Sequence, residues 1–303
     1  MNIKYQISNI KITNQKSKVI SNKKIKDNYF EIIIAAPEIA GSAQPGQFVN
    51  IKVSDGIEPL LRRPLSIHKI GHQGFTRLPS HQSKAKRQIV MLYEAVGKGT
   101  EILSQRKPGE FLDVIGPLGN GFNIDRRPLT IDYRPILIAG GMGTAPLVFL
   151  AEEIKKSQSH KVTKSPILVL LGAKIKDSIL CEEEFKNIGC EVKIATDDGS
   201  RGFKGYVSDL LIRELSAFSS QPSAIYACGP KLLLKEVSRI SQEHHIPAQL
   251  SLESHMACGI GACMGCVIKQ KAEGRKRKAD DAFEYQRVCK EGPVFEANQI
   301  LWE

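Results

Sequence analysis

The sequence lacks any long uninterrupted apolar segment. Its longest apolar stretch, from Ile136 to Leu150, is broken by three glycines and a proline. A helix that spans a bilayer needs about 20 predominantly apolar residues, so this stretch is too short and too interrupted. The first residues also lack the apolar core of a secretion signal. We therefore expect a soluble, cytoplasmic protein that crosses no membrane.

Several motifs of common function classes are also missing. The histidines show no H-E-x-x-H spacing, and there is no Ser/His/Asp or paired-carboxylate signature, so we assign no catalytic residue. The net charge of +11 is concentrated in residues 1–30, 69–88 and 269–278. No zinc-finger or RNA-binding motif accompanies these basic segments. We expect them to form solvated surface that can attract anions or an acidic partner, and we expect no nucleic-acid binding.

Cysteines are few outside one segment. Four of the seven lie between residues 258 and 289, while Cys181, Cys190 and Cys228 are scattered. A disulfide framework fits poorly with a chain of 303 residues that has no export signal. The clustered four are better explained as ligands of a metal or a cluster, and we treat Cys181 and Cys190 as ordinary side chains.

The pattern of apolar residues predicts three domains. Residues 1–127 contain short runs rich in Ile, Val and aromatics, at 31–38, 47–53, 65–70 and 88–96, separated by turn-forming segments. This is typical of an antiparallel β-barrel or sandwich, with residues 71–88 as an expanded hairpin tip. Residues 128–252 alternate between strands and helices, which predicts a doubly wound parallel sheet. Residues 253–303 begin with a loop dense in Gly, Ala and Cys and form a small C-terminal domain.

The strongest chemical signal is Cys258-x4-Cys263-x2-Cys266 followed by the distant Cys289. This is the spacing of plant-type [2Fe–2S] ligands. The small residues between these cysteines let the backbone approach closely and point N–H groups at the cluster sulfurs. A zinc site is the alternative, but structural zinc usually needs two short cysteine pairs, and only one C-x2-C is present here.

Three further segments suggest nucleotide binding. Arg62-Arg63-Pro64-Leu65-Ser66-Ile67 offers a guanidinium and a hydroxyl that could hold a phosphate and a flavin edge, although a charged strand start is an equally ordinary explanation. The turn Gly140-Gly141-Met142-Gly143-Thr144 follows a predicted strand and opens a predicted helix, as pyrophosphate-binding turns do; such a turn can also exist without a ligand.

The third of these segments is Cys228-Gly229-Pro230, which ends a later strand of the same predicted sheet. Ligands of such sheets bind beyond the carboxyl ends of the strands, which would place Cys228 beside a nicotinamide. A buried structural cysteine is the alternative for this residue.

The order of these motifs resembles the electron-transfer subunit of class 1B dihydroorotate dehydrogenase, in the ferredoxin-reductase superfamily. The resemblance runs from about residue 5 to the C-terminus and is carried by RPLS, LYEAVGKGT, GPLGNGF, AGGMGTAP, CGP and ACGIGACMGC with the later VCKEGPVF. Two departures, residues 69–88 and 269–278, look like basic surface insertions.

The resemblance implies a site residue by residue. FAD would be held by residues of three segments: Arg63, Pro64, Leu65, Ser66, Leu92, Tyr93, Glu94, Gly99 and Thr100. NAD would be received by the glycine turn and the later strand end: Gly140, Gly141, Gly143, Thr144, Cys228, Gly229 and Pro230. The cluster ligands would be Cys258, Cys263, Cys266 and Cys289.

The resemblance also implies a function and a partner. Electrons from dihydroorotate, oxidised on a separate FMN-containing catalytic subunit, would pass through the cluster and FAD to NAD+, in a heterotetramer of two plus two chains. A flavin suits this relay because it exchanges electrons singly or in pairs. The acids in Thr196-Asp197-Asp198-Gly199 favour NAD over NADP, since they would repel a 2′-phosphate.

Two alternatives remain open. One is a flavin and iron–sulfur reductase subunit, using NADH or NADPH, that serves ferredoxin, a hydrogenase or an oxygenase. In the related NADPH–ferredoxin transhydrogenase subunit the first ligand position resembles Asp, so Cys258 disfavours that member. The other is a zinc-bound scaffold or basic adaptor without enzymatic activity.

Overall fold

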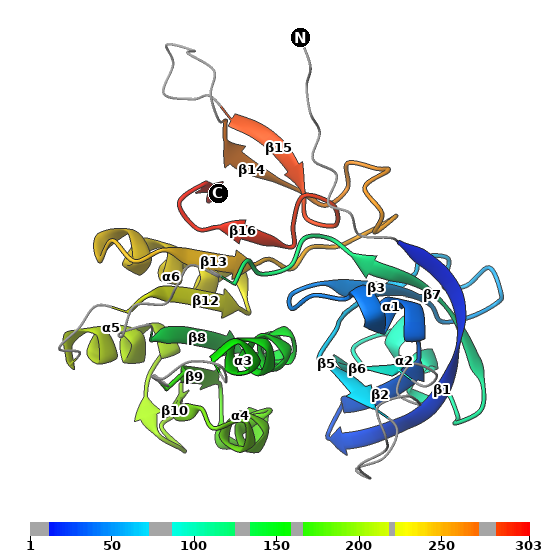
Figure 1. The fold of residues 1–303 in the computed structure, drawn as a ribbon, viewed down its shortest axis with the longest axis horizontal. Coiled ribbons are helices and arrows are strands. Elements are labelled where there is room, and N and C mark those ends of the chain that lie inside the picture. Colours follow the sequence, from blue (N-terminus) through cyan, green and yellow to red (C-terminus); the bar gives the residue numbers. More distant parts are fainter. Residues whose placement is uncertain (1–11, 73–86, 125–133, 159–165, 218–221, 273–282) are drawn as a thin grey trace. The chain divides into compact units, whose positions relative to one another are not determined.

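Figure 1 shows the computed structural model of the chain, which describes residues 12–72, 87–124, 134–158, 166–217, 222–272 and 283–303. The chain divides into two compact units, unit 1 (Met1–Leu118) and unit 2 (Gly119–Glu303). The predicted domain boundary at residues 127 and 128 lies outside the described residues. Within the described residues, no helix is both long enough and apolar enough to cross a membrane.

Unit 1 is built on one antiparallel sheet of seven strands, in the order β4-β3-β7-β1-β2-β6-β5. The strands are β1 (Thr13–Lys26), β2 (Tyr29–Ala35), β3 (Phe48–Lys52), β4 (Arg63–Ser66), β5 (Lys69–His72), β6 (Arg87–Glu94) and β7 (Phe111–Leu118). The helices are α1 (Pro37–Ser42) and α2 (Lys98–Ser104). Alternation of buried and partly exposed residues places Ile32 and Ile34 of β2 in the core, as a strand with one face inward requires.

Two details of unit 1 differ from expectation. The run at 65–70, which the sequence suggested as one strand, is shared between β4 and β5, with a break at Ile67 and His68. The long strand β1 has mostly polar side chains that hide its periodicity, and only Ser17 and Val19 are fully buried. β5 pairs antiparallel with β6, as the predicted hairpin requires, while the expected tip at residues 73–86 lies outside the described residues.

Unit 2 contains a second seven-stranded sheet, in the order β11-β10-β9-β8-β12-β13-β16, parallel except for β16. Its strands are β8 (Pro135–Gly140), β9 (Leu168–Ala173), β10 (Glu191–Thr196), β11 (Phe203–Lys204), β12 (Ala224–Cys228), β13 (Ala248–Ser251) and β16 (Val294–Glu296). The helices are α3 (Thr144–Gln158), α4 (Glu182–Ile188), α5 (Val207–Ala217) and α6 (Lys231–Glu243), with α3 and α4 together on one face and α5 and α6 on the other (Figure 1). Helices on both faces of a parallel sheet make this a doubly wound fold.

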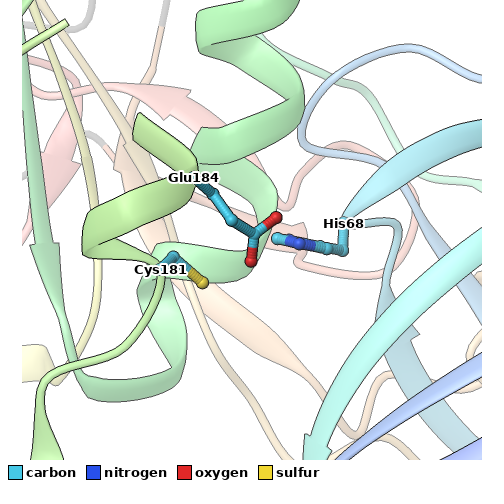
Figure 2. A group of neighbouring side chains, drawn as sticks. All are labelled: His68, Cys181 and Glu184. Atoms are coloured by element: carbon cyan, nitrogen blue, oxygen red, sulfur yellow. The ribbon is translucent and has the colours of Figure 1, made fainter. Parts of the chain in front are cut away.

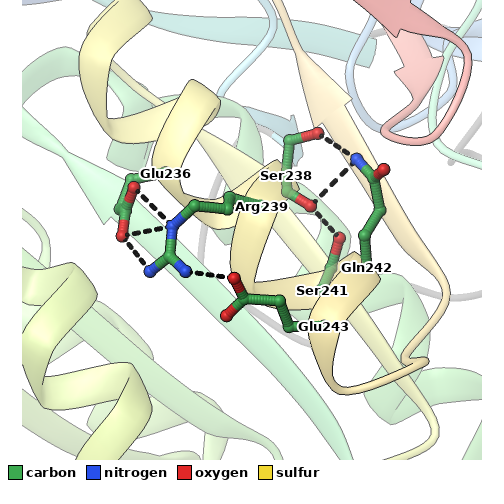
Figure 3. Close-up of polar contacts among 6 residues, drawn as sticks. All are labelled: Glu236, Ser238, Arg239, Ser241, Gln242 and Glu243. Carbon is green, nitrogen blue, oxygen red and sulfur yellow. Dashed lines mark hydrogen bonds and ion pairs between the residues drawn. The ribbon is translucent and has the colours of Figure 1, made fainter.

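The C-terminal segment forms a small sheet, β15-β14-β17, from β14 (Val267–Lys271), β15 (Phe283–Arg287) and β17 (Ile300–Leu301). It also completes the neighbouring sheet, because β16 pairs with β13. The Ser238 hydroxyl of α6 donates to the Ala297 carbonyl at 3.0 Å, and Figure 3 shows the further polar contacts of this helix. The predicted fold class is confirmed, and the predicted second and third domains share one compact unit.

Candidate functional site

The four predicted cluster cysteines are brought together. The loop between β13 and β14 carries Cys258, Cys263 and Cys266, and a turn after β15 carries Cys289. Backbone N–H groups point at the sulfurs: Cys263 N lies 3.3 Å from Cys258 Sγ, Gly261 N lies 3.2 Å from Cys289 Sγ, and Cys289 N lies 3.5 Å from Cys266 Sγ. These donors are of the kind that a cluster bearing thiolates requires.

The arrangement of the sulfurs fits two irons better than one zinc. The side chains of Cys258 and Cys263 contact each other, and so do those of Cys266 and Cys289, which gives two pairs of thiols. No three of the four sulfurs lie within 4.8 Å of one another. Tetrahedral zinc with Zn–S bonds of about 2.3 Å would hold all four within about 3.8 Å of each other. Two pairs set further apart match a [2Fe–2S] cluster, in which each iron takes one pair.

The thiol pKa values also indicate crowded ligands. Burial opposes ionisation of Cys258, but hydrogen bonds from the N–H groups of Cys263 and Ile260 outweigh it and lower its pKa to about 6. Burial raises the pKa of Cys289 to about 12, and the neighbouring Cys266 sulfur adds to the rise. Thiolates crowded in this way are stabilised when metal binds, and metal binding releases their protons.

In unit 1, the structure joins two of the predicted FAD segments. Arg63 opens β4, and Gly99 lies in the first turn of α2. A Cβ atom placed on Gly99 would lie 2.1 Å from Arg63 Nε, so the guanidinium occupies the space that a side chain would fill. Arg62 is tied to β7 instead, through a 3.0 Å ion pair with Asp113. Arg63 is therefore the arginine that faces the predicted FAD residue Gly99, and its guanidinium fits the phosphates of a flavin nucleotide.

The remaining predicted FAD residues of β4 and β6 differ in how far their side chains are buried. Pro64, Leu65 and Ser66 follow Arg63 along β4, paired with β3. Leu92 and Tyr93 are buried near the end of β6, and the Tyr93 hydroxyl donates to Asn22 Oδ1 at 2.9 Å. Burial raises the pKa of Tyr93 to about 12. These two side chains serve the core of unit 1, so a flavin would meet the strand here through its backbone or through the partly exposed Glu94.

The predicted NAD segments meet at adjacent strand ends of unit 2. β8 ends at Gly140, a short turn covers Gly141–Gly143, and α3 begins at Thr144. The Thr144 hydroxyl donates to the Gly141 carbonyl at 3.0 Å. A Cβ atom on Gly143 would lie 2.2 Å from the Cys228 carbonyl oxygen, so this turn rests directly on the end of β12. The turn leads directly into the N-terminus of α3, the kind of position at which a pyrophosphate binds.

The sheet order identifies this junction independently. From β8 the chain moves outward through β9, β10 and β11, and then returns to β12 on the other side of β8. The point between β8 and β12 is thus the topological switch point, where open α/β sheets bind ligands. Cys228 ends β12 and is buried, and burial with the nearby Glu253 raises its pKa to about 12. Its thiol stays protonated, which suits a neutral wall beside a nicotinamide.

A pocket of about 490 Å³ opens beside this strand end within unit 2. Its lining runs from Gly229 and Lys231 to Glu253, and on to Tyr285 and Trp302 of the C-terminal segment. The pocket therefore lies between the end of β12 with the start of α6 and the small C-terminal sheet.

The two cysteines that we treated as ordinary side chains, Cys190 and Cys181, lie in different surroundings. Cys190 is buried, and burial raises its pKa to about 11. Cys181 precedes α4 with φ of 60°, and Figure 2 shows its thiol beside Glu184 of the same helix, with sulfur and carboxylate oxygen within 4.8 Å. His68, drawn with them, belongs to unit 1.

Two residues beside the cluster were missed by sequence reasoning. Arg287 and Glu291 flank Cys289 four positions apart and form an ion pair. The signal was present, since opposite charges at this spacing meet on one face of a helical turn, but it carries little weight without knowledge of the turn.

Comparison with known proteins agrees with the geometry. Residues 253–301 match the family described as iron-sulfur cluster binding domain of dihydroorotate dehydrogenase B. Residues 137–239 match the oxidoreductase NAD-binding domain. The electron transfer subunit of dihydroorotate dehydrogenase B (NAD(+)) from Desulforamulus reducens is 40% identical over 95% of this chain and 98% of its own length. The subunit of the same name from Geobacillus kaustophilus is 36% identical over 96% and 99%.

Solved structures support the fold. A structure of an NADH-dependent reduced ferredoxin–NADP oxidoreductase, studied for electron bifurcation, aligns with a TM-score of 0.73 and 27% identity over 94% of this chain and 90% of that one. An Amycolatopsis cytochrome P450 reductase aligns with a TM-score of 0.60 and 16% identity over 78% and 67%, which speaks for the fold alone.

Proposed function

The chain belongs to the family of electron transfer subunits of dihydroorotate dehydrogenase B (NAD(+)), and on that premise we propose its place in the reaction. It receives electrons that an FMN-containing catalytic subunit removes from dihydroorotate, and passes them through a [2Fe–2S] cluster and FAD to NAD+ in pyrimidine biosynthesis. The observation that carries this proposal is the set of four cysteines, arranged in two pairs with backbone N–H donors aimed at their sulfurs.

Each cofactor has residues of this chain to hold it. Cys258 and Cys263 would bind one iron, and Cys266 and Cys289 the other. Arg63, over Gly99, would neutralise the phosphates of FAD. The turn Gly141–Gly143 and the N-terminus of α3 would receive the pyrophosphate of NAD. When bound, FAD links the two-electron chemistry of NAD to the one-electron chemistry of the cluster.

The protein's own part in the relay is positioning. Two of the cluster ligands, Cys266 and Cys289, are 2% exposed, which keeps water away from one side of the cluster. In the loop that carries three of the ligands, Ile260 and Met264 are 48% and 56% exposed. Exposed apolar side chains beside a buried redox centre are suited to packing against another protein. We propose that the catalytic subunit docks over these two side chains, in a cytoplasmic assembly of two plus two chains.

Reconstitution tests the whole proposal. The chain is combined with an FMN-containing dihydroorotate dehydrogenase subunit, and NADH formation is followed after dihydroorotate is added. We expect NADH only when both subunits are present, with about two irons and one FAD per chain. The proposal would be contradicted if this polypeptide formed NADH from dihydroorotate without the FMN subunit. It would also be contradicted if the polypeptide coupled to ferredoxin in preference to the FMN subunit.

A cysteine substitution sharpens the test. Cys266→Ser should lose the cluster and all coupled NADH formation, while FAD stays bound, because a serine hydroxyl is a poor ligand for iron in such a cluster. Cys190→Ser is the matched control, since Cys190 is also buried but lies away from the cluster segment. Full iron content together with full coupled turnover in Cys266→Ser would refute the assignment.

A further inference from the structure

One charged side chain bridges the two segments that carry the cluster ligands. Arg287 Nη1 donates to the carbonyl of Gly261, in the cluster loop, at 2.7 Å. Its Nε donates to Glu291 Oε2 at 3.0 Å, and its Nη2 to the other carboxylate oxygen. Its backbone N–H donates to the same carboxylate at 2.8 Å. The guanidinium therefore connects the loop of Cys258, Cys263 and Cys266 to the turn of Cys289.

The loop and the turn are closely packed where this bridge forms. Gly261 has a φ of 79°, and a Cβ atom on it would lie 2.5 Å from the side chain of Lys290. The N–H of Gly261 points at Cys289 Sγ while its carbonyl accepts from Arg287. The backbone N–H and the carbonyl of Gly261 are thus both held by the Cys289 turn, which ties the loop of three ligands to the turn that carries the fourth.

A comparison with Arg239 shows that the pair of Arg287 and Glu291 is more than an ordinary helix ion pair. Arg239 of α6 also pairs with acids three and four residues away, Glu236 and Glu243 (Figure 3). The Arg239 side chain is 47% exposed, whereas the Arg287 and Glu291 side chains are 24% and 28% exposed. Exposed pairs contribute little, while bidentate pairs shielded from water, with an additional carbonyl partner, contribute more.

We propose that Arg287 is a positioning residue of the cluster, which braces the cluster loop to the Cys289 turn and makes the cluster easier to reduce. The inference rests on the proposed electron-transfer role, because it concerns the same four cysteines. Glu291 orients the guanidinium and partly offsets its charge.

The sign of the electrostatic effect follows from the charge of the cluster. Two ferric irons with two sulfides and four thiolates carry net negative charge, and reduction adds one more negative charge. A nearby cation stabilises the reduced form more than the oxidised form, and a nearby anion does the opposite. The Arg287 guanidinium contacts the Gly261 carbonyl, and the N–H of the same Gly261 points at Cys289 Sγ, so the charge lies close to the cluster ligands. Arg287 and Glu291 should therefore shift the reduction potential in opposite directions.

The central experiment compares Arg287→Gln with the wild-type chain, each carrying its cluster. The midpoint potential is measured by redox titration followed by electron paramagnetic resonance, and iron release to a chelator is timed. We expect a more negative midpoint, by about tenfold in the one-electron equilibrium or about 59 mV. Iron release should be about tenfold faster, because the brace from loop to turn is lost.

Further variants separate charge from bracing. Arg287→Lys keeps the charge but cannot contact the carbonyl and both carboxylate oxygens together, so it should restore most of the potential but little of the iron retention. Glu291→Gln should shift the midpoint to a more positive value, and this variant keeps the test valid if Arg287→Gln does not fold. Arg239→Gln, which removes an arginine with the same ion-pair spacing, should change neither quantity.

Several outcomes would overturn the inference. An unchanged midpoint and unchanged iron release in Arg287→Gln would do so, as would a negative or absent shift in Glu291→Gln. These failures differ from failure of the proposed function, which would appear in the wild-type chain as an absent cluster or as a lack of coupling to the FMN subunit.

Discussion

The two nucleotide-binding regions are closed in different ways. In unit 2, the glycine turn rests on the end of β12 by backbone against backbone, with the Gly143 Cβ position 2.2 Å from the Cys228 carbonyl oxygen. In unit 1, the two FAD segments meet through the end of a flexible side chain, since Arg63 lies over Gly99. A backbone contact cannot yield without moving a strand, whereas a guanidinium can rotate away. The NAD region is therefore rigid, and the FAD region is adjustable.

The largest effect should come from adding a methyl group to the rigid contact. Gly143→Ala would force α3 away from β12, because both sides of the contact are backbone. We expect a loss of about 1–3 kcal/mol in the stability of unit 2, together with weaker NADH binding. Thermal unfolding and NADH titration measure the two effects.

Gly41→Ala is the control for this change, since a Cβ atom there meets only the tip of Arg87, at 3.4 Å. A Gly143→Ala protein with wild-type stability and wild-type NADH affinity would show that the junction can yield, and the contrast between the two regions would disappear.

A smaller and different effect is expected in the FAD region. Gly99→Ala should displace the Arg63 guanidinium while leaving the sheet intact, because the group that must move is a side-chain end. We expect FAD affinity to fall by about tenfold, the usual effect of losing one charge-assisted contact, with little change in melting temperature. Isothermal titration of the flavin-free chain provides the measurement.

Gly97→Ala is matched to that change, because no atom lies within 4 Å of a Cβ placed there. If Gly99→Ala unfolds unit 1 instead of weakening FAD binding, the contact between Arg63 and Gly99 is structural.

The third effect concerns Thr100, which the resemblance assigns to FAD. Its hydroxyl accepts from Val96 N at 3.0 Å and donates to the Gly97 carbonyl at 3.1 Å, so it closes the turn that begins α2. Thr100→Val should cost about 1 kcal/mol of stability, as the loss of a cap does, and Thr100→Ser should restore it. Unfolding in urea measures this cost. Weaker FAD binding without a loss of stability would indicate direct contact with the cofactor instead.

Sequence reasoning succeeded where chemistry is local. The cluster segment could be predicted because three ligands lie within nine residues, from Cys258 to Cys266, and their spacing alone is diagnostic. The parallel sheet was predicted because strands and helices alternate along residues 128–252. The glycine turn was predicted because it joins such a strand to a helix.

Contacts between distant segments could not be predicted in this way. Nothing in the order of residues indicates that Arg63 rather than Arg62 faces Gly99, because the choice depends on Asp113 of β7 holding Arg62. The contact from the Tyr93 hydroxyl to Asn22 could not be predicted either, because Asn22 lies on β1, a strand with no readable period. The bridge from Arg287 to Gly261 joins residues 26 positions apart and became visible only with the turn in place.

The smallest effect is expected in the loop after β10, where the ribose of NAD is expected to lie. It tests whether the choice between NADH and NADPH can change while the rest of the NAD region stays rigid. Asp198 Oδ1 accepts from Ser200 N at 2.9 Å and from Ser200 Oγ at 2.6 Å, and these bonds lower the pKa of Asp198. Asp198 keeps its charge but also holds its own turn, whereas we expect the equally exposed Asp197 to repel a 2′-phosphate without shaping the turn. Asp197→Asn should raise NADPH use relative to NADH by a few fold, since one exposed charge contributes about 1 kcal/mol or less.

Asp198→Asn should weaken the binding of both nucleotides alike, because it loosens the turn. Ratios of kcat/KM for the two nucleotides decide the matter: an unchanged ratio in Asp197→Asn, with a changed ratio in Asp198→Asn, would reverse the roles assigned to the two acids.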